Sequence, residues 1–260
     1  MGNEIFASPE AGAVLSALRE CFGASLLALY LHGSAVSGGL RPQSDLDLLA
    51  VVDRPMSDQA SQQLLNKLMK ISRAPGVPGA GRPVELIVFL ADELAAPGYP
   101  AGCEFIYGEW LRADFDAGNP AEPLRDPELT LVLAQARQQA LPLFGPAADR
   151  LLPDIAPPQT RQAMQDALPA LLDSLSGDER NVILTLARMW RTASCGDFAS
   201  KEEAAHWAAA RLGPEPAKLM NLALSGYTGA ARDDWSTCPQ EVRATAAELQ
   251  ALVLEALSPA

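Results

Sequence analysis

The sequence predicts two domains: an α/β or α+β domain at the N-terminus, followed by an all-helical domain. Helix and strand patterns alternate over the first 90 residues, whereas strand signals stop after about residue 125. The stretch at 145–158 is rich in proline and separates the two patterns, as is typical of a linker. We therefore expect a first domain at 1–150 and a second at 151–260.

The first domain begins with a helix and then places short apolar runs between helical and loop segments. Pro9 suits a first helical turn, and Ser57 stands in the position of a helix cap. Short apolar runs bounded by turn residues are typical of buried strands. In chain order we expect a helix at 9–22, strands at 25–32 and 46–52, a helix at 58–72, a loop at 74–83 and a strand at 84–90.

Helix signals dominate the rest of the chain. Asp126, Pro127 and Glu128 place a capping acid, a proline and a second acid together, which predicts a helix that runs to about residue 140. Proline and glycine residues then divide four or five further helical segments. We expect these at roughly 160–175, 179–194, 201–211, 215–227 and 240–257.

The composition is that of an ordinary globular protein with an acidic surface. Apolar residues make up 48% of the chain and charged residues 20%. The 20 basic and 32 acidic side chains give a formal net charge of −12, which argues against a nucleic-acid partner and favours a cationic ligand or a metal. Four scattered cysteines and two histidines argue against a zinc site and for a reducing compartment.

Neither a signal peptide nor a membrane span is indicated. The N-terminus carries an early acid and no basic region ahead of an apolar stretch. The longest apolar runs fall far short of the roughly 20 residues that a membrane span needs. We expect a cytoplasmic protein without a membrane partner.

The most informative segment reads LHGSAVSGGLRPQSDLDLL, from Leu31 to Leu49. Asp45 and Asp47 are two positions apart on an expected strand, so both side chains point to one face. Two carboxylates on one face repel each other unless a divalent cation lies between them. The pattern therefore predicts a metal site at the mouth of an apolar strand, although an exposed pair of acids on an edge strand remains the plain alternative.

Two neighbouring features extend this site. Gly33 allows the backbone to approach a ligand closely, and Ser34 offers a hydroxyl and an amide to a phosphate. Glu85 stands near the start of the next expected strand, beside the acidic pair if the two strands are neighbours. Three converging carboxylates suffice to hold one or two Mg²⁺ ions and to supply a base.

These residues resemble a known family. Gly-Ser, nine residues, then Ser-Asp-x-Asp resembles the signature of the nucleotidyltransferase superfamily. Together with VELIVF, FIYGEWLR, GDERNVILTLARMW and the segment 201–207, it is similar to the aminoglycoside (3'')(9) adenylyltransferases, the streptomycin and spectinomycin resistance enzymes. The similarity covers about residues 10–250 in order.

The resemblance implies an α/β (α+β) nucleotidyltransferase domain with a mixed sheet, followed by an all-α helical bundle, with ATP and the drug binding between them. In such an enzyme AMP passes from Mg-ATP to the 3'' hydroxyl of streptomycin or the 9 hydroxyl of spectinomycin. The partners are then these small molecules and no nucleic acid, and the resemblance implies a monomer. Contacts to ATP from both domains imply closure on ATP binding.

Roles follow residue by residue. Asp45, Asp47 and Glu85 resemble the family's Mg²⁺ site, with Glu85 also the general base. Ser34 and Ser44 resemble its contacts to the nucleotide phosphates, although Ser44 is alternatively a turn residue.

The second half of the chain completes the nucleotide site by resemblance. Arg188, Lys201 and Tyr227 are similar to the family's phosphate and adenosine contacts. Their plainer interpretations are an ion-pair partner, a solvated surface residue and a buried core residue. Glu128 occupies a position where relatives carry Asp.

For the drug, Trp110, Asp178 and Glu85 resemble the family's pocket residues. The plainer interpretations are a tryptophan that fills an interdomain core for Trp110 and a helix N-cap for Asp178. Relatives that act on streptomycin carry a Trp and an Asp where this chain has Pro169 and Ser174, unless a shifted register brings in Asp173.

Three alternative functions stay open. One is a 9-adenylyltransferase that acts on spectinomycin only, which Pro169 and Ser174 favour. Another is a nucleotide-binding regulatory module of the same superfamily, although such proteins are usually shorter and lack a helical domain. The third is a non-catalytic binder, against which the intact set of Ser34, Asp45, Asp47 and Glu85 argues.

Overall fold

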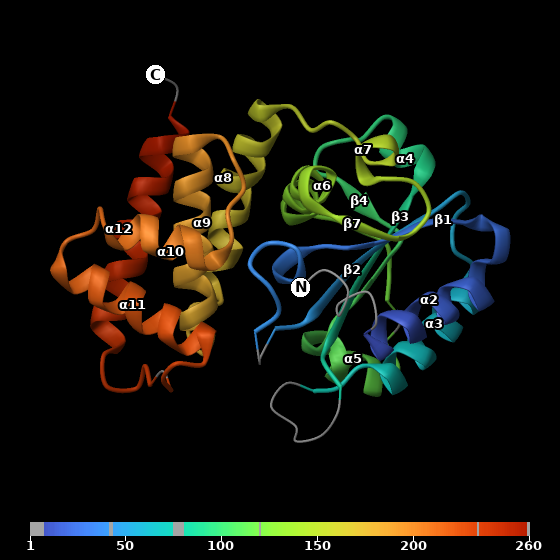
Figure 1. Cartoon of the computed structure of the whole chain (residues 1–260), viewed down its shortest axis with the longest axis horizontal. Coiled ribbons are helices and arrows are strands. Elements are labelled where there is room, and N and C mark those ends of the chain that lie inside the picture. Colours follow the sequence, from blue (N-terminus) through green and yellow to red (C-terminus); the bar gives the residue numbers. More distant parts are fainter. Residues whose placement is uncertain (1–7, 42–43, 75–80, 120, 233, 259–260) are drawn as a thin grey trace. The chain divides into compact units, whose positions relative to one another are not determined.

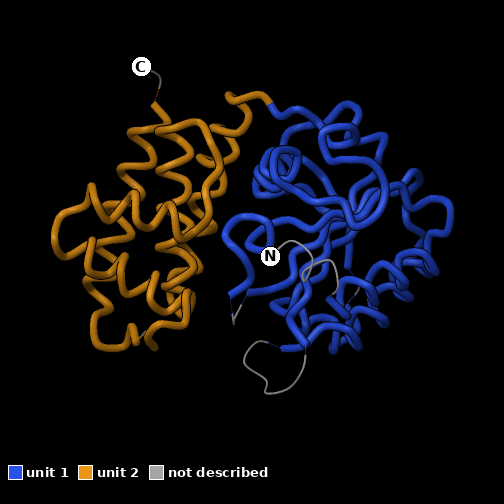
Figure 2. Tube along the Cα trace, in the orientation of Figure 1, with its two compact units in different colours: residues 1–155 blue, residues 156–260 orange. Residues whose placement is uncertain are grey.

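The computed structural model describes residues 8–41, 44–74, 81–119, 121–232 and 234–258, so most of the expected loop at 74–83 lies outside the described residues. The chain divides into two compact units, Met1–Ile155 and Ala156–Ala260 (Figure 2). The division expected after residue 150 falls inside the short helix α7 (Ala148–Leu151).

A five-stranded mixed sheet forms the centre of the first unit, as the family resemblance implies. Its order is β5-β3-β2-β1-β7, in which β2 and β3 run parallel and the other neighbours run antiparallel. The strands are β1 (Leu26–Leu31), β2 (Leu46–Val52), β3 (Val84–Leu90), β5 (Phe105–Tyr107) and β7 (Leu141–Phe144). A separate pair joins β4 (Gly102–Cys103) to β6 (Leu124–Arg125).

The expectation that no strand follows residue 125 is wrong. Strand β7 pairs antiparallel with β1, and Pro142 lies opposite Tyr30. A proline inside a short apolar run argues against a strand, but at the edge of a sheet its missing N–H costs no ladder hydrogen bond. Strands β4, β5 and β6 have two or three residues each, which is too short to show a periodic pattern.

Two helices cover one face of the sheet. Helices α2 (Pro9–Phe22) and α3 (Asp58–Ile71) begin at Ser8 and Ser57, whose hydroxyls accept hydrogen bonds from backbone N–H groups of the first turn. They pack with every second residue of β2 and β3 in one apolar core. Figure 1 places α6 (Pro127–Gln139) and α7 across the sheet from them. Asp47 and Glu85 occupy the alternate positions, so they face away from α2 and α3.

The second unit is a bundle of helices, as expected. Helix α9 packs against α8, α10, α11 and α12, and the guanidinium of Arg161 on α8 donates to the carbonyl oxygens of Ala193 (3.1 Å) and Ala256 (2.6 Å). The helices are α8 (Pro157–Asp173), α9 (Glu179–Cys195), α10 (Lys201–Ala209), α11 (Pro214–Thr228) and α12 (Pro239–Leu257).

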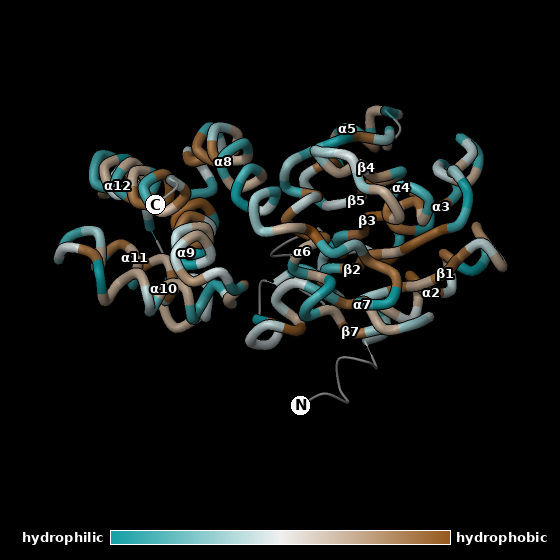
Figure 3. Tube along the Cα trace, turned by 90° about the horizontal axis from the view of Figure 1, so that it is seen from above, coloured by the Kyte–Doolittle hydropathy of each residue, from teal (hydrophilic) through white to brown (hydrophobic). Residues whose placement is uncertain are grey.

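The hydropathy of the chain follows this architecture. Figure 3 shows strongly hydrophobic positions along strands β1 and β3, whereas many hydrophilic positions lie on the surrounding helices. Across the described ranges, none of the helices combines the length and the hydropathy that crossing a membrane requires.

Candidate active site

A tight turn after β1 brings the Gly33-Ser34 pair onto Asp47. The backbone N–H of Ser34 donates to Asp47 Oδ2 (3.3 Å), and the N–H of His32 donates to the backbone carbonyl of Asp47 (3.0 Å). Gly33 has φ 62°, and a Cβ at this position would lie 1.9 Å from Asp47 Oδ2. Only glycine therefore permits this approach, both for its backbone conformation and for its lack of a side chain.

Asp47 and Glu85 are direct neighbours across the parallel pairing of β2 and β3. Both side chains are half-buried and lie on the same face of the sheet. Asp45 precedes β2 by one residue and is also half-buried. Like charges directly opposite each other on a sheet are destabilising, so this edge favours a bound cation.

The residues present suit magnesium, although they do not form a ready-made cage. Among the residues that the structure describes, no three His, Cys, Asp or Glu side chains group closely enough to hold a metal ion. The expected convergence of Asp45, Asp47 and Glu85 on one ion is therefore absent from this arrangement. Mg²⁺ usually binds one or two carboxylates together with waters and substrate phosphates, and Asp45 and Asp47 supply hard oxygen ligands of that kind.

The two serines of the motif differ in their surroundings. Within the described part of the chain, the half-exposed Ser34 hydroxyl has no hydrogen-bond partner. The buried Ser44 hydroxyl accepts a bond from the N–H of Arg41 (3.0 Å), and Arg82 donates to the carbonyl oxygens of Arg41 (2.7 Å) and Ser44 (3.1 Å). These bonds fit the interpretation of Ser44 as a turn residue, whereas its contact to a phosphate stays a prediction.

His32 lies buried beneath the turn and adds no positive charge to it. Desolvation lowers the pKa of its imidazole to about 4, against a smaller opposing effect of a hydrogen bond with the backbone of Leu48. Its Nε2 has no hydrogen-bond partner among the described residues. The neutral ring therefore does not offset the negative charge of Asp45 and Asp47.

Trp110 and Glu128 lie on other elements of the first unit. Trp110 is 57% exposed in a short turn, so it is not part of the core of the first unit, whereas the interdomain core stays a prediction. Glu128 is in the first turn of α6, where its N–H donates to the capping Asp126 carboxylate (2.7 Å). Although Glu128 keeps exposed surface, desolvation and repulsion from Asp126 raise the pKa of its carboxyl. Such a carboxylate gains from a ligand that donates a hydrogen bond to it.

In the second unit, one side chain joins several of the expected ligand contacts. Asn181 Nδ2 donates to Asp178 Oδ2 (3.0 Å), and its Oδ1 accepts a bond from Lys201 Nζ. Lys201 Nζ also lies 5.7 Å from the centroid of the Tyr227 ring. Sequence reasoning did not single out Asn181, although it closes the Gly177–Asn181 segment of the GDERN motif.

The two remaining expected contacts on α9 have defined partners. Asp178 is in the N-cap position, but its side chain makes no capping hydrogen bond to the helix backbone, so the plain N-cap interpretation fails. The Nε of Arg188 donates to the carbonyl oxygen of Ala199 (3.2 Å) and thereby ties α9 to the segment before α10.

Comparisons with known proteins agree with this arrangement. Residues 13–91 match a model of the nucleotidyltransferase domain, and residues 150–251 match one of the C-terminal domain of aminoglycoside adenylyltransferases. A spectinomycin 9-adenylyltransferase of Staphylococcus aureus is 43% identical over 230 residues, which are 88% of each chain. The chain belongs to the aminoglycoside adenylyltransferase family.

Other family members show the same extent of similarity. An aminoglycoside (3'')(9) adenylyltransferase of Escherichia coli is 37% identical over 212 residues, 80% of each chain. The crystal structure of spectinomycin adenyltransferase AAD(9) of Enterococcus faecalis with ATP and spectinomycin has a TM-score of 0.89 and 32% identity, and covers 94% of this chain and 98% of that one. The family's fold, a nucleotidyltransferase domain with a mixed sheet and a helical domain, is confirmed, and the protein is an adenylyltransferase.

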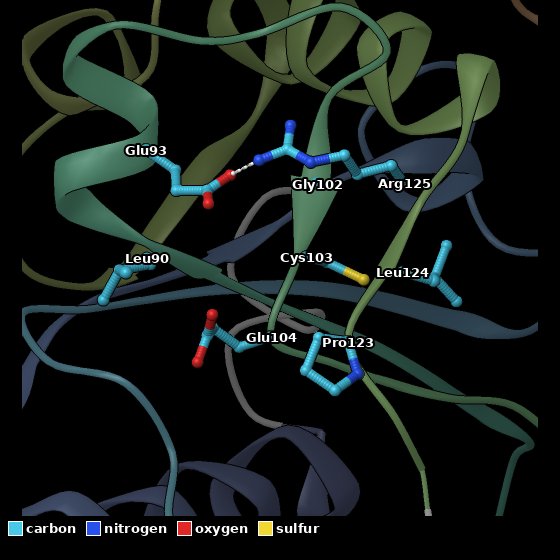
Figure 4. A pocket seen from close by; sticks show the side chains of 8 residues that line it. All are labelled: Leu90, Glu93, Gly102, Cys103, Glu104, Pro123, Leu124 and Arg125. Carbon is cyan, nitrogen blue, oxygen red and sulfur yellow. Dashed lines mark hydrogen bonds and ion pairs between the residues drawn. The ribbon is translucent and has the colours of Figure 1, made fainter.

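A shallow cavity of about 180 Å³ in the adenylyltransferase's first unit lies apart from these residues (Figure 4). It is at the end of β3 that is opposite to Glu85, and none of the expected site residues lines it. An ion pair between Glu93 and Arg125 (2.6 Å) spans its side. Its lining consists of Leu90, Glu93, Gly102, Cys103, Glu104, Pro123, Leu124 and Arg125.

Proposed function

We propose that this adenylyltransferase transfers AMP from Mg-ATP to the 9 hydroxyl of spectinomycin and the 3'' hydroxyl of streptomycin, and so confers resistance to both drugs. The observation that carries the chemistry is the pairing of Asp47 with Glu85 beside the Gly33 turn. The names of the Staphylococcus aureus and Escherichia coli relatives support the acceptors.

In this proposal the first unit performs the chemical step. Asp45 and Asp47 would hold magnesium, which when bound neutralises charge on the triphosphate. Glu85 accepts the proton of the acceptor hydroxyl, and the hydroxyl oxygen forms a bond to the α-phosphorus as the bond to pyrophosphate breaks. A positioned base of this kind typically contributes about 10²–10⁴-fold to the rate. The hydroxyl of Ser34 binds a phosphate oxygen.

The second unit and α6 supply further contacts to the nucleotide. Lys201 contacts the phosphates with its ammonium, which Asn181 and Tyr227 hold in place. Arg188 adds a guanidinium that suits phosphate oxygens, because a planar fork of donors matches them. Glu128 accepts hydrogen bonds from the nucleotide.

The acceptor meets an aromatic ring and two acids. Trp110 stacks on a ring of the drug, while Asp178 and Glu85 bind its cationic groups. Spectinomycin is the acceptor that the chain favours. Ser174, which replaces an Asp of the streptomycin-modifying relatives, donates its hydroxyl to the carbonyl of Leu171 (2.8 Å), and Pro169 lies inside α8. A 9-adenylyltransferase without streptomycin activity is therefore the second candidate.

The test incubates the purified protein with Mg-ATP and each drug separately and follows pyrophosphate release and drug mass. A gain of one AMP on both drugs, lost in Glu85→Gln and after removal of divalent metal by EDTA, supports the proposal. AMP on spectinomycin alone supports the second candidate. Binding of ATP without transfer to either drug contradicts both and favours a regulatory nucleotide-binding module or a non-catalytic binder.

We further propose that the enzyme works in the cytoplasm as a monomer and closes on Mg-ATP. Light scattering coupled to size-exclusion chromatography tests the monomer, for which one mass near 27.6 kDa is expected. Small-angle scattering with and without Mg-ATP tests closure, and identical dimensions in the two states contradict it.

A further inference from the structure

The indole of Trp110 lies directly against the backbone of Gly108. A Cβ on Gly108 would stand 2.0 Å from Cζ3, 2.2 Å from Cη2 and 2.4 Å from Cε3 of the ring. The backbone at Gly108 is extended, with φ −162°, so any residue adopts it without strain. The ring of Trp110, rather than the backbone, is therefore what a side chain at this position would displace.

The residue between them is a buried acid with several donors. The Glu109 side chain is 6% exposed, and its Oε1 accepts hydrogen bonds from Ser72 Oγ (2.5 Å) and Tyr107 OH (2.9 Å). Arg112 adds bonds from Nη2 to Oε1 (3.0 Å) and from Nε to Oε2 (3.2 Å). The carboxylate thus fixes the turn that carries the exposed tryptophan.

The same network reaches the strand of the proposed base. Ser72 Oγ, which donates to Glu109, also accepts the N–H of Val84 (3.0 Å), the residue before Glu85. Arg112 Nη1 donates to the carbonyl oxygen of Met69 at the end of α3. One buried carboxylate therefore connects the start of β3 with the turn of Trp110.

We propose that Gly108 and Glu109 are positioning residues that hold the Trp110 indole as a preformed wall for the ring of an aminocyclitol or aminoglycoside acceptor. The inference deepens the proposed function and rests on it. An exposed aromatic side chain ordinarily samples several rotamers, and binding then has to restrict it. The Trp110 ring packs against Gly108, and the buried Glu109 carboxylate fixes the turn. Binding of the acceptor therefore does not have to restrict the rotamers of the ring. The hydrogen bonds of Ser72 to Glu109 and to the N–H of Val84 connect the turn that carries the ring with the strand that carries Glu85.

Gly108→Ala is the direct test, because the new methyl group must displace the indole. Gly12→Ala is the matched control, since a Cβ at Gly12 has no neighbour within 4 Å. We expect the KM for spectinomycin to rise about tenfold in Gly108→Ala, with kcat and the KM for ATP within twofold of wild type. In a Trp110→Ala background, Gly108→Ala should not change the KM for spectinomycin further. The two residues act through one contact, which the Trp110→Ala substitution has already removed.

A second measurement does not depend on turnover. In protein labelled with 5-fluorotryptophan, the ¹⁹F resonance of Trp110, assigned with Trp110→Phe, should shift or broaden in Gly108→Ala and stay unchanged in Gly12→Ala. The resonances of Trp190, Trp207 and Trp235 should keep their positions. An unchanged Trp110 resonance in Gly108→Ala overturns the inference that Gly108 sets the position of the indole. A shifted resonance with an unchanged acceptor KM overturns its role in acceptor binding.

Glu109→Gln tests the buried anchor, with Glu109→Asp as the variant that keeps the charge. We expect the acceptor KM to rise in the glutamine variant and to return partly toward wild type in the aspartate variant. An equal fall of kcat for every acceptor together with a raised KM for ATP indicates general damage and overturns a positioning role. If the protein modifies no drug at all, the proposed function fails, whereas the ¹⁹F measurement still decides whether Gly108 sets the pose of Trp110.

Discussion

Asp47 and Glu85 lie side by side because β2 and β3 run parallel and in register, although 37 residues separate them in the chain. The parallel pairing aligns the starts of the two strands, so each carboxylate stands just inside an apolar strand on the same face. A one-residue slip would turn one of them toward the core formed with α2 and α3. The acidic site is therefore a product of sheet register, which the buried alternate residues of both strands enforce.

The first prediction concerns Glu85. Glu85→Gln keeps the size of the side chain and removes the proton acceptor, so we expect kcat to fall at least about 100-fold. The dissociation constant for ATP, measured by calorimetry in the presence of magnesium, should change little. Glu93→Gln on α4 (Ala91–Ala95) is the matched control, because that acid lies at the far end of β3 and pairs with Arg125. A kcat near wild type in Glu85→Gln contradicts the assignment of the base.

The second prediction separates backbone strain from site geometry at Gly33. Gly33 (φ 62°) and Gly23 (φ 56°) both have a positive φ, but only at Gly33 does a Cβ meet Asp47, since the space around Gly23 is open. Alanine at either position should lower the free energy of unfolding by about 1–3 kcal/mol for the backbone alone, because residues with a side chain rarely adopt a positive φ.

Only Gly33→Ala should also displace Asp47, so we expect it to abolish transfer and weaken binding of Mg-ATP, while Gly23→Ala keeps both. Urea unfolding and a filter-binding assay for ATP make the comparison. Equal activity in the two variants would mean that the close approach to Asp47 is dispensable.

Asn181 provides the third prediction, because its amide bridges Asp178 and Lys201. Asn181→Ala removes both hydrogen bonds, and a loss of about 1 kcal/mol in ligand binding corresponds to roughly fivefold in KM. We expect the KM for ATP and for spectinomycin to rise together, since one proposed contact for each ligand loses its support. Asn66→Ala on α3, where an exposed amide accepts a bond from Gln62, is the control and should leave both constants unchanged. A change in kcat alone would argue against the bridge.

Much of this organisation follows from local sequence, and the exceptions have physical causes. The strand containing Asp47 and the strand containing Glu85 were predictable because short, mostly apolar runs are typical of buried strands. Strand β7 was missed because Pro142 lies inside its short apolar run, and a proline there argues against a strand. Strand β5 was missed because three residues are too few to show an alternating hydrophobic pattern. The family resemblance supplied the proposed roles of Lys201 and Asp178, while the bridge through Asn181 depends on packing between α9 and α10, which no local pattern records.

The network around Glu109 leads to the last prediction, a difference in pH dependence between wild type and Glu109→Gln. Burial alone would raise the pKa of Glu109, but the hydrogen bonds from Ser72, Arg112 and Tyr107, together with the charge of Arg112, lower it below its usual value of 4.5. A carboxyl with a lowered pKa stabilises the fold above its unfolded pKa, and this stability is lost as the pH falls through the folded pKa. Above pH 5 the free energy of unfolding of the wild type should therefore exceed that of Glu109→Gln by about 1–3 kcal/mol. The reason is that the variant leaves buried hydrogen-bond donors without a charged acceptor. This difference in the free energy of unfolding should narrow as the pH falls below about 4.5.

Urea titrations at pH 7, 5, 4 and 3 measure the difference between wild type and Glu109→Gln. Glu20→Gln is the control because Glu20 is an exposed acid paired with Lys67. A gap that stays constant from pH 7 to pH 3 would show that the charge of Glu109 does not contribute to holding the turn of Trp110.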